Sequence, residues 1–386
     1  MYGNLFGAPN RETFATSLLN AIRRAGDERP IRLDRDNFCL QVEQDKIRLF
    51  LAQAYDEYVA AAGRERRGVI ERYVGVWLEG GQAQGPPDTF AEARAGLLPR
   101  VRERIYFEQS RLQLGADIPF RLLSTELGLE LVHEDSVALT LEHLEEWDVS
   151  FEEALKVARL NLAERSQAEF RELAPGYFVS TWKDGYDATR LLLAERLVAL
   201  AVKGSPVALA LRADTLAVTG SEDAAGVGRL AALAQEAIGQ DGLLSPIPVV
   251  WRGGAWHPFV PAVEHPHYEA VRRLFMQSAA RDYALQAPLL QSYHPEAQLA
   301  GYELARDRDT GHWVDLVSWD EAAGQQLLPR ASTVSLVRQG RSQGYFRWEK
   351  LHEVCGELLE PLAYHPPRVA TLGFPSEEQI TRMRLG

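Results

Sequence analysis

The sequence is short of cysteine and of long apolar runs, and both shortages narrow the class of protein. Its 386 residues include two cysteines, Cys39 and Cys355, each within an apolar pattern, so the disulfide framework of small secreted domains is not indicated. No stretch approaches the roughly 18 uninterrupted apolar residues of a membrane helix. Residues 1–10 lack the layout of a signal peptide. We therefore expect a cytoplasmic protein without membrane association, with both thiols buried.

Positive charge is also scarce. Lysine and arginine total 42 against 54 acidic residues, which gives a net charge of −12, and such a field repels a phosphate backbone unless cations gather locally. Arginine is dense at residues 64–67, and a later basic run spans residues 338–348. The second segment contains the residues that could stack on bases, Arg341, Tyr345, Phe346, Arg347 and Trp348. Alternation along an edge strand is the simpler interpretation, so nucleic-acid binding is the last of three functional alternatives.

The motifs of common catalytic sites are missing. The sequence has no GxxxxGK[ST] phosphate loop, no GxSxG nucleophile turn and no HExxH zinc motif. Gly226, Gly228 and Ala231 fit a degenerate GxGxxA. That motif begins eight residues after a strand that we expect to end near Val218, too far for the helix to meet a pyrophosphate. Cys39 lies within an expected strand, which favours a core thiol over a nucleophile. We therefore predict no catalytic residue and no cofactor.

One arrangement recurs along the chain: strand, polar turn, strand and then a helix. The copies are QVEQDKIRLFL from Gln41, LVHEDSVALTL from Leu131, LALRADTLAVTG from Leu209 and a looser VRQGRSQGYFRW from Val337. Alternating apolar and polar residues around a polar turn are typical of a β-hairpin. The recurrence predicts duplicated hairpin-plus-helix units, although hairpins are common enough to leave coincidence open. The expected fold class is α+β, with tandem units in the order helix, strand, strand, strand, helix.

Helix and turn signals divide the chain into three expected α+β domains, at residues 1–113, 114–294 and 295–386. The first ends in a pair of helices over residues 68–113, because a helical apolar period continues from Phe90 to Ile105 despite Pro99. The second contains a well-marked helix start, since Ser150 and Glu153 form a capping box. The third is the smallest and opens with a hairpin.

The densest group of polar side chains lies in the segment DGYDATR. Two carboxylates, a phenol and a guanidinium fall within one turn and the start of a helix, at Asp184, Tyr186, Asp187 and Arg190. Such a group could bind a charged ligand or a partner, and carboxylates can supply acid and base roles in a hydrolase. A structural interpretation stands beside this one. In it Asp184 shapes the turn, Asp187 caps the helix and Arg190 pairs with one of the two.

Histidines gather in one segment, WHPFVPAVEHPHYE. Its potential metal ligands are His257, Glu264, His265 and His267. Histidines two residues apart can face the same way on an extended strand, so a metal centre is geometrically possible. The spacing matches no established zinc pattern and the segment is rich in proline. We therefore predict no metal site.

Five segments in order resemble the YtpQ-like family of bacterial proteins of unknown function. They are DNFCL at 36–40, LLPRVR at 97–102, LEEWDVSFEEALKVARLNL at 144–162, DGYDATRLLL at 184–193 and DTLAVTGSED at 214–223. The resemblance covers about residues 10–290 and implies a bacterial, cytosolic protein, but the family carries no established activity. The helix, three-strand, helix order also resembles the fold of type III secretion chaperones, which bind other proteins.

These observations favour a non-catalytic adaptor or chaperone-like protein that binds another protein through a sheet face or an edge strand. An enzyme with an unfamiliar site around Asp184, Asp187 and Arg190 is the second alternative. Nucleic-acid binding through the C-terminal run is the third. The sequence leaves open the identity of the partner, the oligomeric state, and whether the hairpins share one sheet.

Overall fold

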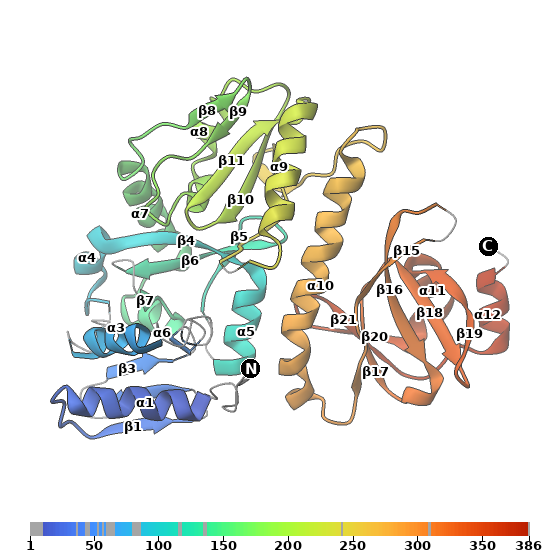
Figure 1. Cartoon of the computed structure of the whole chain (residues 1–386), viewed down its shortest axis with the longest axis horizontal. Coiled ribbons are helices and arrows are strands. Elements are labelled where there is room, and N and C mark those ends of the chain that lie inside the picture. Colours follow the sequence, from blue (N-terminus) through green and yellow to red (C-terminus); the bar gives the residue numbers. More distant parts are fainter. Residues whose placement is uncertain are drawn as a thin grey trace, which may run out of the picture. The chain divides into compact units, whose positions relative to one another are not determined.

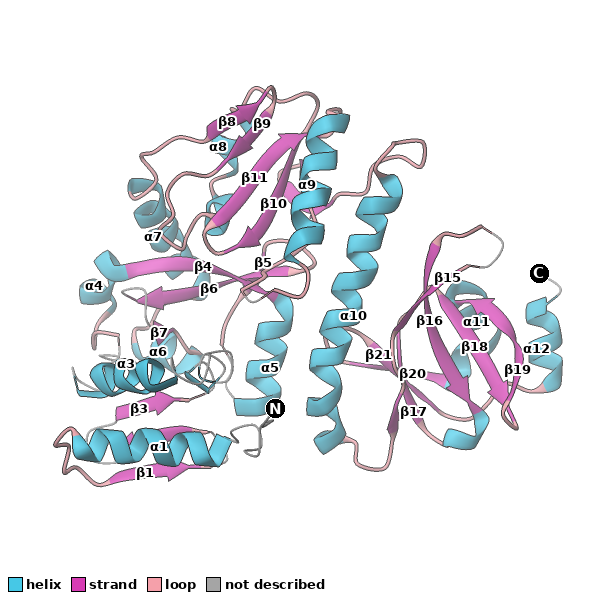
Figure 2. Cartoon of the chain, viewed as in Figure 1, coloured by secondary structure: helices cyan, strands magenta, loops and turns pink. Residues whose placement is uncertain are grey.

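The computed structural model describes residues 11–384, apart from residues 36–37, 43–46, 52–53, 56–57, 59–65, 79–85, 115–117, 134–136, 241 and 308–309. Helices alternate with several small antiparallel or mixed sheets (Figures 1 and 2). The expected α+β class is confirmed, whereas the likeness to secretion chaperones stays a prediction. The chain divides into a first unit, Met1–Gly96 with His133–Val149, and a second unit, Leu97–Val132 with Ser150–Gly386. The three domains expected from the sequence stay a prediction.

The first unit is built around one three-stranded antiparallel sheet. Its elements are α1 (Arg11–Arg24), β1 (Ile31–Asp34), β2 (Cys39–Val42), β3 (Ile47–Phe50), α3 (Arg66–Leu78), α4 (Phe90–Ala93), β7 (Val137–Ala138) and α6 (Leu141–Glu146). Phe14, Leu18 and Ile22 recur every four residues, so they share one face of α1. All three are buried in one apolar cluster with Leu40 of β2 and Trp77 of α3. This cluster fixes α1 against α3.

The second unit begins with β4 (Leu97–Glu103), which lies beside β6 (Leu127–His133) in a sheet that continues to β5 (Arg121–Leu122). Helix α5 (Arg104–Leu114) follows β4, and α7 (Phe151–Glu164) packs on β4. The helix expected to run from Phe90 to Ile105 is therefore wrong over residues 97–103. Pro99 lacks the amide hydrogen that a helix interior needs. Glu130 on β6 accepts from Arg100 and Arg102 at 2.6 and 2.8 Å, which ties the strand in place.

The second unit also contains a six-stranded antiparallel sheet. Its order is β13 (Ala255–Pro258), β12 (Val249–Arg252), β10 (Pro206–Arg212), β11 (Thr215–Gly220), β9 (Tyr177–Val179) and β8 (Arg171–Ala174). Along β10, Val207 and Leu209 pack with helix α9 (Ala224–Ala237) in one apolar cluster. Ala208 and Ala210 pack in another cluster, with the 3₁₀ turn Ala188–Leu192 and helix α8 (Ala194–Val198). This alternation is what a strand buried on both faces requires.

Two four-stranded sheets and three helices complete the second unit. The elements are α10 (Tyr268–Tyr293), β14 (Gln298–Leu299), β15 (Glu303–Arg306), β16 (Trp313–Asp320), β17 (Gln326–Pro329), β18 (Thr333–Arg338), β19 (Arg341–Arg347), α11 (Trp348–Cys355), β20 (Leu359–Leu362), β21 (Arg368–Thr371) and α12 (Glu377–Arg384). One sheet has the order β15, β16, β18, β19, and the other β14, β17, β21, β20. Trp319, Val334 and Leu351 lie in the apolar cluster between these elements.

The structure settles several local predictions. Strands β2 and β3, β10 and β11, and β18 and β19 pair as antiparallel hairpins. They lie in three different sheets, so the hairpins do not share one sheet, and a duplication stays a prediction. The turn residues at 43–46 and 134–136 lie outside the described residues. Ser150 and Glu153 form the expected capping box.

Two further expectations concern membranes and thiols. Among the helices of the described residues, none is long and apolar enough to span a bilayer. Neither Cys39 nor Cys355 forms a disulfide within the described residues, and both are buried, as expected. Burial raises the pKa of the Cys355 thiol to about 11, so it stays protonated and unreactive near neutral pH.

Candidate functional site

The cluster expected from the sequence contains a buried ion pair. The two terminal nitrogens of Arg190 donate to the carboxylate oxygens of Asp184 at 2.8 and 2.7 Å. Its Nε donates to Ser166 Oγ at 2.8 Å, and its guanidinium carbon lies 4.2 Å from the centre of the Trp182 ring. Asp184 Oδ1 also accepts the Tyr186 amide at 2.9 Å. The pairing of Arg190 and the turn role of Asp184, both part of the structural interpretation, are therefore present.

Asp187 does not cap a helix as the sequence suggested. It precedes the 3₁₀ turn Ala188–Leu192, but its side chain makes no capping hydrogen bond. Its φ of −53° and ψ of −51° are helical rather than the extended values of a cap residue. The side chain is fully buried, and neither carboxylate oxygen has a hydrogen-bond partner within the described part of the chain. The capping prediction is wrong. Asp187 is instead a buried carboxylate without a partner among the described residues, which is rare in folded proteins.

The cluster as a whole faces inward. Arg190 and Asp187 are fully buried, and Tyr186 packs in an apolar cluster with Leu98. Asp184 is the most exposed of the four, with 37% of its side chain accessible. Burial acts to raise the pKa of Asp184, but hydrogen bonds from Arg190 and the Tyr186 amide hold it below the ordinary value. A solute could reach Asp184 but not the guanidinium, which favours a structural role for Arg190.

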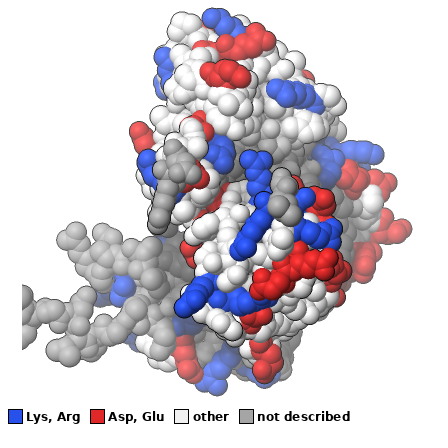
Figure 3. All heavy atoms as spheres, turned by 90° about the vertical axis from the view of Figure 1, so that its right-hand side faces the viewer, with Lys and Arg blue, Asp and Glu red and all other residues white. Residues whose placement is uncertain are grey.

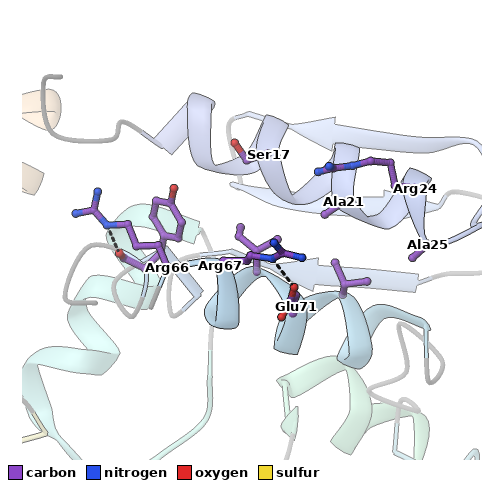
Figure 4. Close-up of a pocket in the computed structure, with 10 residues that line it drawn as sticks. Ser17, Ala21, Arg24, Ala25, Arg66, Arg67 and Glu71 are labelled. Carbon is purple, nitrogen blue, oxygen red and sulfur yellow. Dashed lines mark hydrogen bonds and ion pairs between the residues drawn. The ribbon is translucent and has the colours of Figure 1, made fainter. Parts of the chain in front are cut away.

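A groove in the first unit lies between α1 and α3, with a volume of about 830 Å³ (Figure 4). It is lined at helical spacing by Ser17, Ala21, Arg24 and Ala25 of α1 and by Arg66, Arg67, Ile70, Glu71 and Val74 of α3, with Tyr58 beside them. Ala21, Ile70 and Val74 are half-buried, and we call them the apolar floor. We call Arg24, Arg66 and Arg67 the arginine rim.

The arginine rim is held by contacts within the first unit. Arg67 Nε donates to Glu71 Oε1 at 2.7 Å, but both side chains are largely exposed, so the pair contributes little. Arg66 Nε donates to the Tyr58 carbonyl at 3.1 Å, and Arg24 Nε donates to a carbonyl of its own helix at 3.2 Å. The groove therefore gathers three guanidinium groups along its edges, on a chain whose net charge is −12.

A buried carboxylate fixes the two helices that form the groove. Asp27 follows α1, and its Oδ2 accepts the indole N–H of Trp77 on α3. The Arg29 guanidinium donates to the same carboxylate at 2.7 to 3.1 Å, and the Arg29 amide at 2.9 Å. These bonds from Arg29, with the Trp77 indole, hold the pKa of Asp27 far below its ordinary value against the opposing effect of burial.

The aromatic and basic run near the C-terminus divides between core and surface. Phe346 and Trp348 are buried in the apolar cluster around Trp319, while Tyr345 on edge strand β19 is 68% exposed. Figure 3 shows basic and acidic groups side by side on the face that carries the C-terminal elements. A row of stacked bases needs successive exposed aromatics. Burial of two of the three therefore weakens the nucleic-acid alternative.

The histidine-rich segment does not form a ligand group of three. The rings of His265 and His267 lie 5.8 Å apart, and His265 Nδ1 accepts the His267 amide at 3.1 Å. His257 lies on β13 and is exposed. No third potential ligand among the described residues joins these histidines closely enough to share an ion.

Another group of potential ligands comes together in the second unit. Glu126, Asp282 and His365 each offer one ligand atom, and these atoms lie within 4.8 Å of one another. Burial raises the pKa of Asp282 and, with the charge of Asp282, that of Glu126. Burial, with the nearby charge of Arg104, lowers the pKa of His365 to about 3, so its imidazole is neutral.

Sequence reasoning missed both new sites for the same reason. The arginines at 66 and 67 stood out, but Arg24 belongs to another helix and only packing places it opposite them. Glu126, Asp282 and His365 are separated by more than 80 residues at each step. No local spacing rule connects residues so far apart, and no motif around any of the three is typical of metal ligands.

Comparisons of the chain with models of protein families, with curated proteins and with solved structures found no match. The resemblance to the YtpQ-like family therefore rests on its motifs alone.

Proposed function

We propose that this protein is a non-catalytic adaptor that binds an acidic, amphipathic segment of another protein in the groove between α1 and α3. The combination of an apolar floor with an arginine rim carries the proposal. A helix laid in a groove buries apolar side chains spaced three and four residues apart. Carboxylates on the flanks of such a helix would meet Arg24 on one side and Arg66 and Arg67 on the other.

The local charge of the groove, rather than the charge of the whole chain, supports an acidic partner. The net charge of −12 repels other acidic molecules at long range, so an acidic segment gains attraction only where arginines gather. Such complementarity contributes mainly to specificity and to the rate of association. The volume of about 830 Å³ lies within the range of pockets that bind compact ligands, and it can take several side chains of a peptide.

The test uses a designed peptide and the full chain. The probe is a 20-residue helix with leucine at positions i, i+3, i+4 and i+7 and glutamate on both flanks, labelled for fluorescence anisotropy. We expect saturable binding that weakens as salt rises, because exposed ion pairs are screened. The double variant Arg24→Glu/Arg67→Glu should weaken binding about tenfold or more, since each 1.4 kcal/mol corresponds to a factor of ten.

Two controls separate the groove from general electrostatics. Arg252→Glu changes an exposed arginine at the end of β12, in the second unit, and should leave binding unchanged. A peptide with lysine in place of every glutamate should not bind. Equal affinity for both peptides, or equal weakening by Arg252→Glu, would contradict the proposal. Proteins captured from host cytosol by the wild type and lost with the groove variant then identify the natural partner.

An enzyme is the second candidate function, and Asp187 is the observation that favours it. A fully buried carboxylate with no hydrogen-bond partner among the described residues is more common at functional sites than elsewhere. The burial of Arg190 argues against a substrate that spans the whole cluster. Turnover of ester, phosphoester, nucleotide or peptide substrates that is lost in Asp187→Ala would support the hydrolase and displace the adaptor.

The family assignment is part of the same proposal. The five segments from DNFCL to DTLAVTGSED support membership of the YtpQ-like family, and through it a bacterial, cytosolic setting. An adaptor role agrees with a family for which no activity is established.

A further inference from the structure

We infer that Glu126, Asp282 and His365 form a binding site for one divalent transition-metal ion such as Zn²⁺ or Mn²⁺. Their three ligand atoms lie within 4.8 Å of one another. Ligands bound about 2.0 to 2.2 Å from one ion lie about 3 to 3.5 Å apart, so modest side-chain rotations close the site. The site belongs to the second unit and is independent of the groove between α1 and α3.

The scaffold holds His365 beside helix α10. His365 lies in the loop between β20 and β21. The two residues that follow it accept hydrogen bonds from side chains of α10 within one helical turn of Asp282. The Gln286 amide donates to the Pro366 carbonyl at 2.7 Å. The Tyr283 hydroxyl donates to the Pro367 carbonyl at 2.7 Å. The loop is therefore fixed at the position along α10 where Asp282 stands.

The two carboxylates are also held by their surroundings. The Glu126 carbonyl accepts the amide of Arg104, which anchors the turn before β6 to the start of α5. Asp282 Oδ1 accepts from Arg281 Nε at 3.1 Å, and Arg281 also pairs with Glu103. The bond from Arg281 orients the Asp282 carboxylate in the way that partners of metal ligands do, while the backbone bond fixes the position of Glu126.

The site contains a buried ring nitrogen with no hydrogen-bond partner among the described residues. His365 Nε2 is shielded from solvent and has no hydrogen-bond partner in the described structure. Asp282 is 6% exposed, so water cannot fully solvate its charge. The carboxylates of Glu126 and Asp282 lie close together, and like charges at that distance repel each other. A divalent ion would satisfy the ring nitrogen and both carboxylates at once.

The donor set indicates the class of metal. One imidazole nitrogen with two carboxylate oxygens suits Zn²⁺, Mn²⁺ or Fe²⁺. Ca²⁺ and Mg²⁺ prefer sites made entirely of oxygen, and Ca²⁺ takes six to eight ligands. A neutral imidazole and two carboxylates also balance the charge of a divalent ion. Three protein ligands leave room for water on the ion.

Titration calorimetry on the full chain tests the inference. The protein is first freed of metal with a chelator, and ZnCl₂, MnCl₂, MgCl₂ and CaCl₂ are then added in separate experiments. We expect one equivalent of Zn²⁺ or Mn²⁺ to bind at micromolar concentration or below, with Mg²⁺ and Ca²⁺ at least about a hundredfold weaker. Ligand binding to the native state also raises the melting temperature.

Variants locate the ion. Glu126→Gln and His365→Gln keep the size of each side chain, and each should weaken Zn²⁺ binding by at least about tenfold. Circular dichroism and the melting profile without metal confirm that each variant is folded. His267→Gln in the histidine-rich segment is the matched control and should bind as the wild type does. The absence of Zn²⁺ and Mn²⁺ binding to folded wild type overturns the inference, as does full affinity in both ligand variants.

Discussion

The guanidinium of Arg190 binds both carboxylate oxygens of Asp184, at 2.8 and 2.7 Å, while Arg190 is fully buried and Asp184 is partly open to solvent. This difference makes the pair asymmetric. If Asp184 is removed, the guanidinium remains buried without a counter-charge. If Arg190 is removed, water can still solvate the carboxylate.

We therefore expect Asp184→Ala to lower the free energy of unfolding by about 3 to 5 kcal/mol. Arg190→Met should cost less, about 1 to 3 kcal/mol, because methionine refills the apolar part of the space. Urea unfolding followed by circular dichroism measures both. Glu195→Gln, which breaks the exposed pair with Arg159, is the control and should change stability by less than about 1 kcal/mol. A larger loss for Arg190→Met than for Asp184→Ala would refute the asymmetry.

Asp187 leads to the opposite expectation for stability. Burial of a charged or polar group without a partner is unfavourable, and both oxygens of Asp187 are in that position. Asp187→Ala should raise the free energy of unfolding by about 1 to 3 kcal/mol. Glu236→Ala, an exposed position on α9, should change it by less than about 0.5 kcal/mol. Destabilisation by Asp187→Ala would mean that the carboxylate holds the fold together, and a functional role would lose its support.

The sequence predicted features whose residues are neighbours in the chain. The capping box at Ser150 and the pairing of Arg190 with Asp184 depend on residues at most six positions apart. Hairpins were predictable for the same reason. Strand β4 was not, because the apolar spacing around it fits a helix equally well and its partner strand β6 lies about thirty residues onward.

The candidate sites show the same limit. Arg24 and Arg67 come from two helices that only the packing of α1 on α3 brings together. Glu126, Asp282 and His365 converge through the contacts of α10 with segments far away in the sequence. The spacing of neighbouring residues in the sequence cannot predict which distant residues the fold brings together. It follows from the way in which sheets and helices bury their apolar faces.

Because of Asp27, we expect the first unit to lose stability in acid before the second unit does. Its pKa lies far below the ordinary value in the folded state, so its contribution to stability is present above the unfolded pKa of about 3.9 and is lost as the pH falls through the folded pKa. Hydrogen exchange measured by mass spectrometry at pH 7 and pH 3, corrected for the intrinsic rate, should show protection falling in α1 and α3.

The variant Asp27→Asn separates this carboxylate from other acidic groups. It should lower protection of α1 and α3 already at pH 7, because asparagine cannot replace the charge-assisted bonds from Arg29 and Trp77. Its protection should then change less between pH 7 and pH 3 than that of the wild type. The same acid sensitivity in Asp27→Asn as in the wild type would assign the effect to another group.

The glycine at position 226 is required by close packing rather than by a nucleotide. A Cβ atom there would lie 1.9 Å from Thr219 Oγ1 of β11 and 2.7 Å from an oxygen of Asp223, so α9 could not keep its distance from the sheet. Gly226→Ala should therefore destabilise the protein by about 1 to 3 kcal/mol, despite the higher helix propensity of alanine. Gly75→Ala in α3 is the control, because a Cβ atom there would meet no described atom within 4 Å. This substitution should add up to about 1 kcal/mol of stability.

Thermal unfolding of the two variants, with nucleotide binding measured beside it, distinguishes the two explanations. Destabilisation by Gly226→Ala without any change in nucleotide affinity supports packing, whereas unchanged stability with loss of a bound nucleotide would restore the phosphate-binding interpretation of GxGxxA.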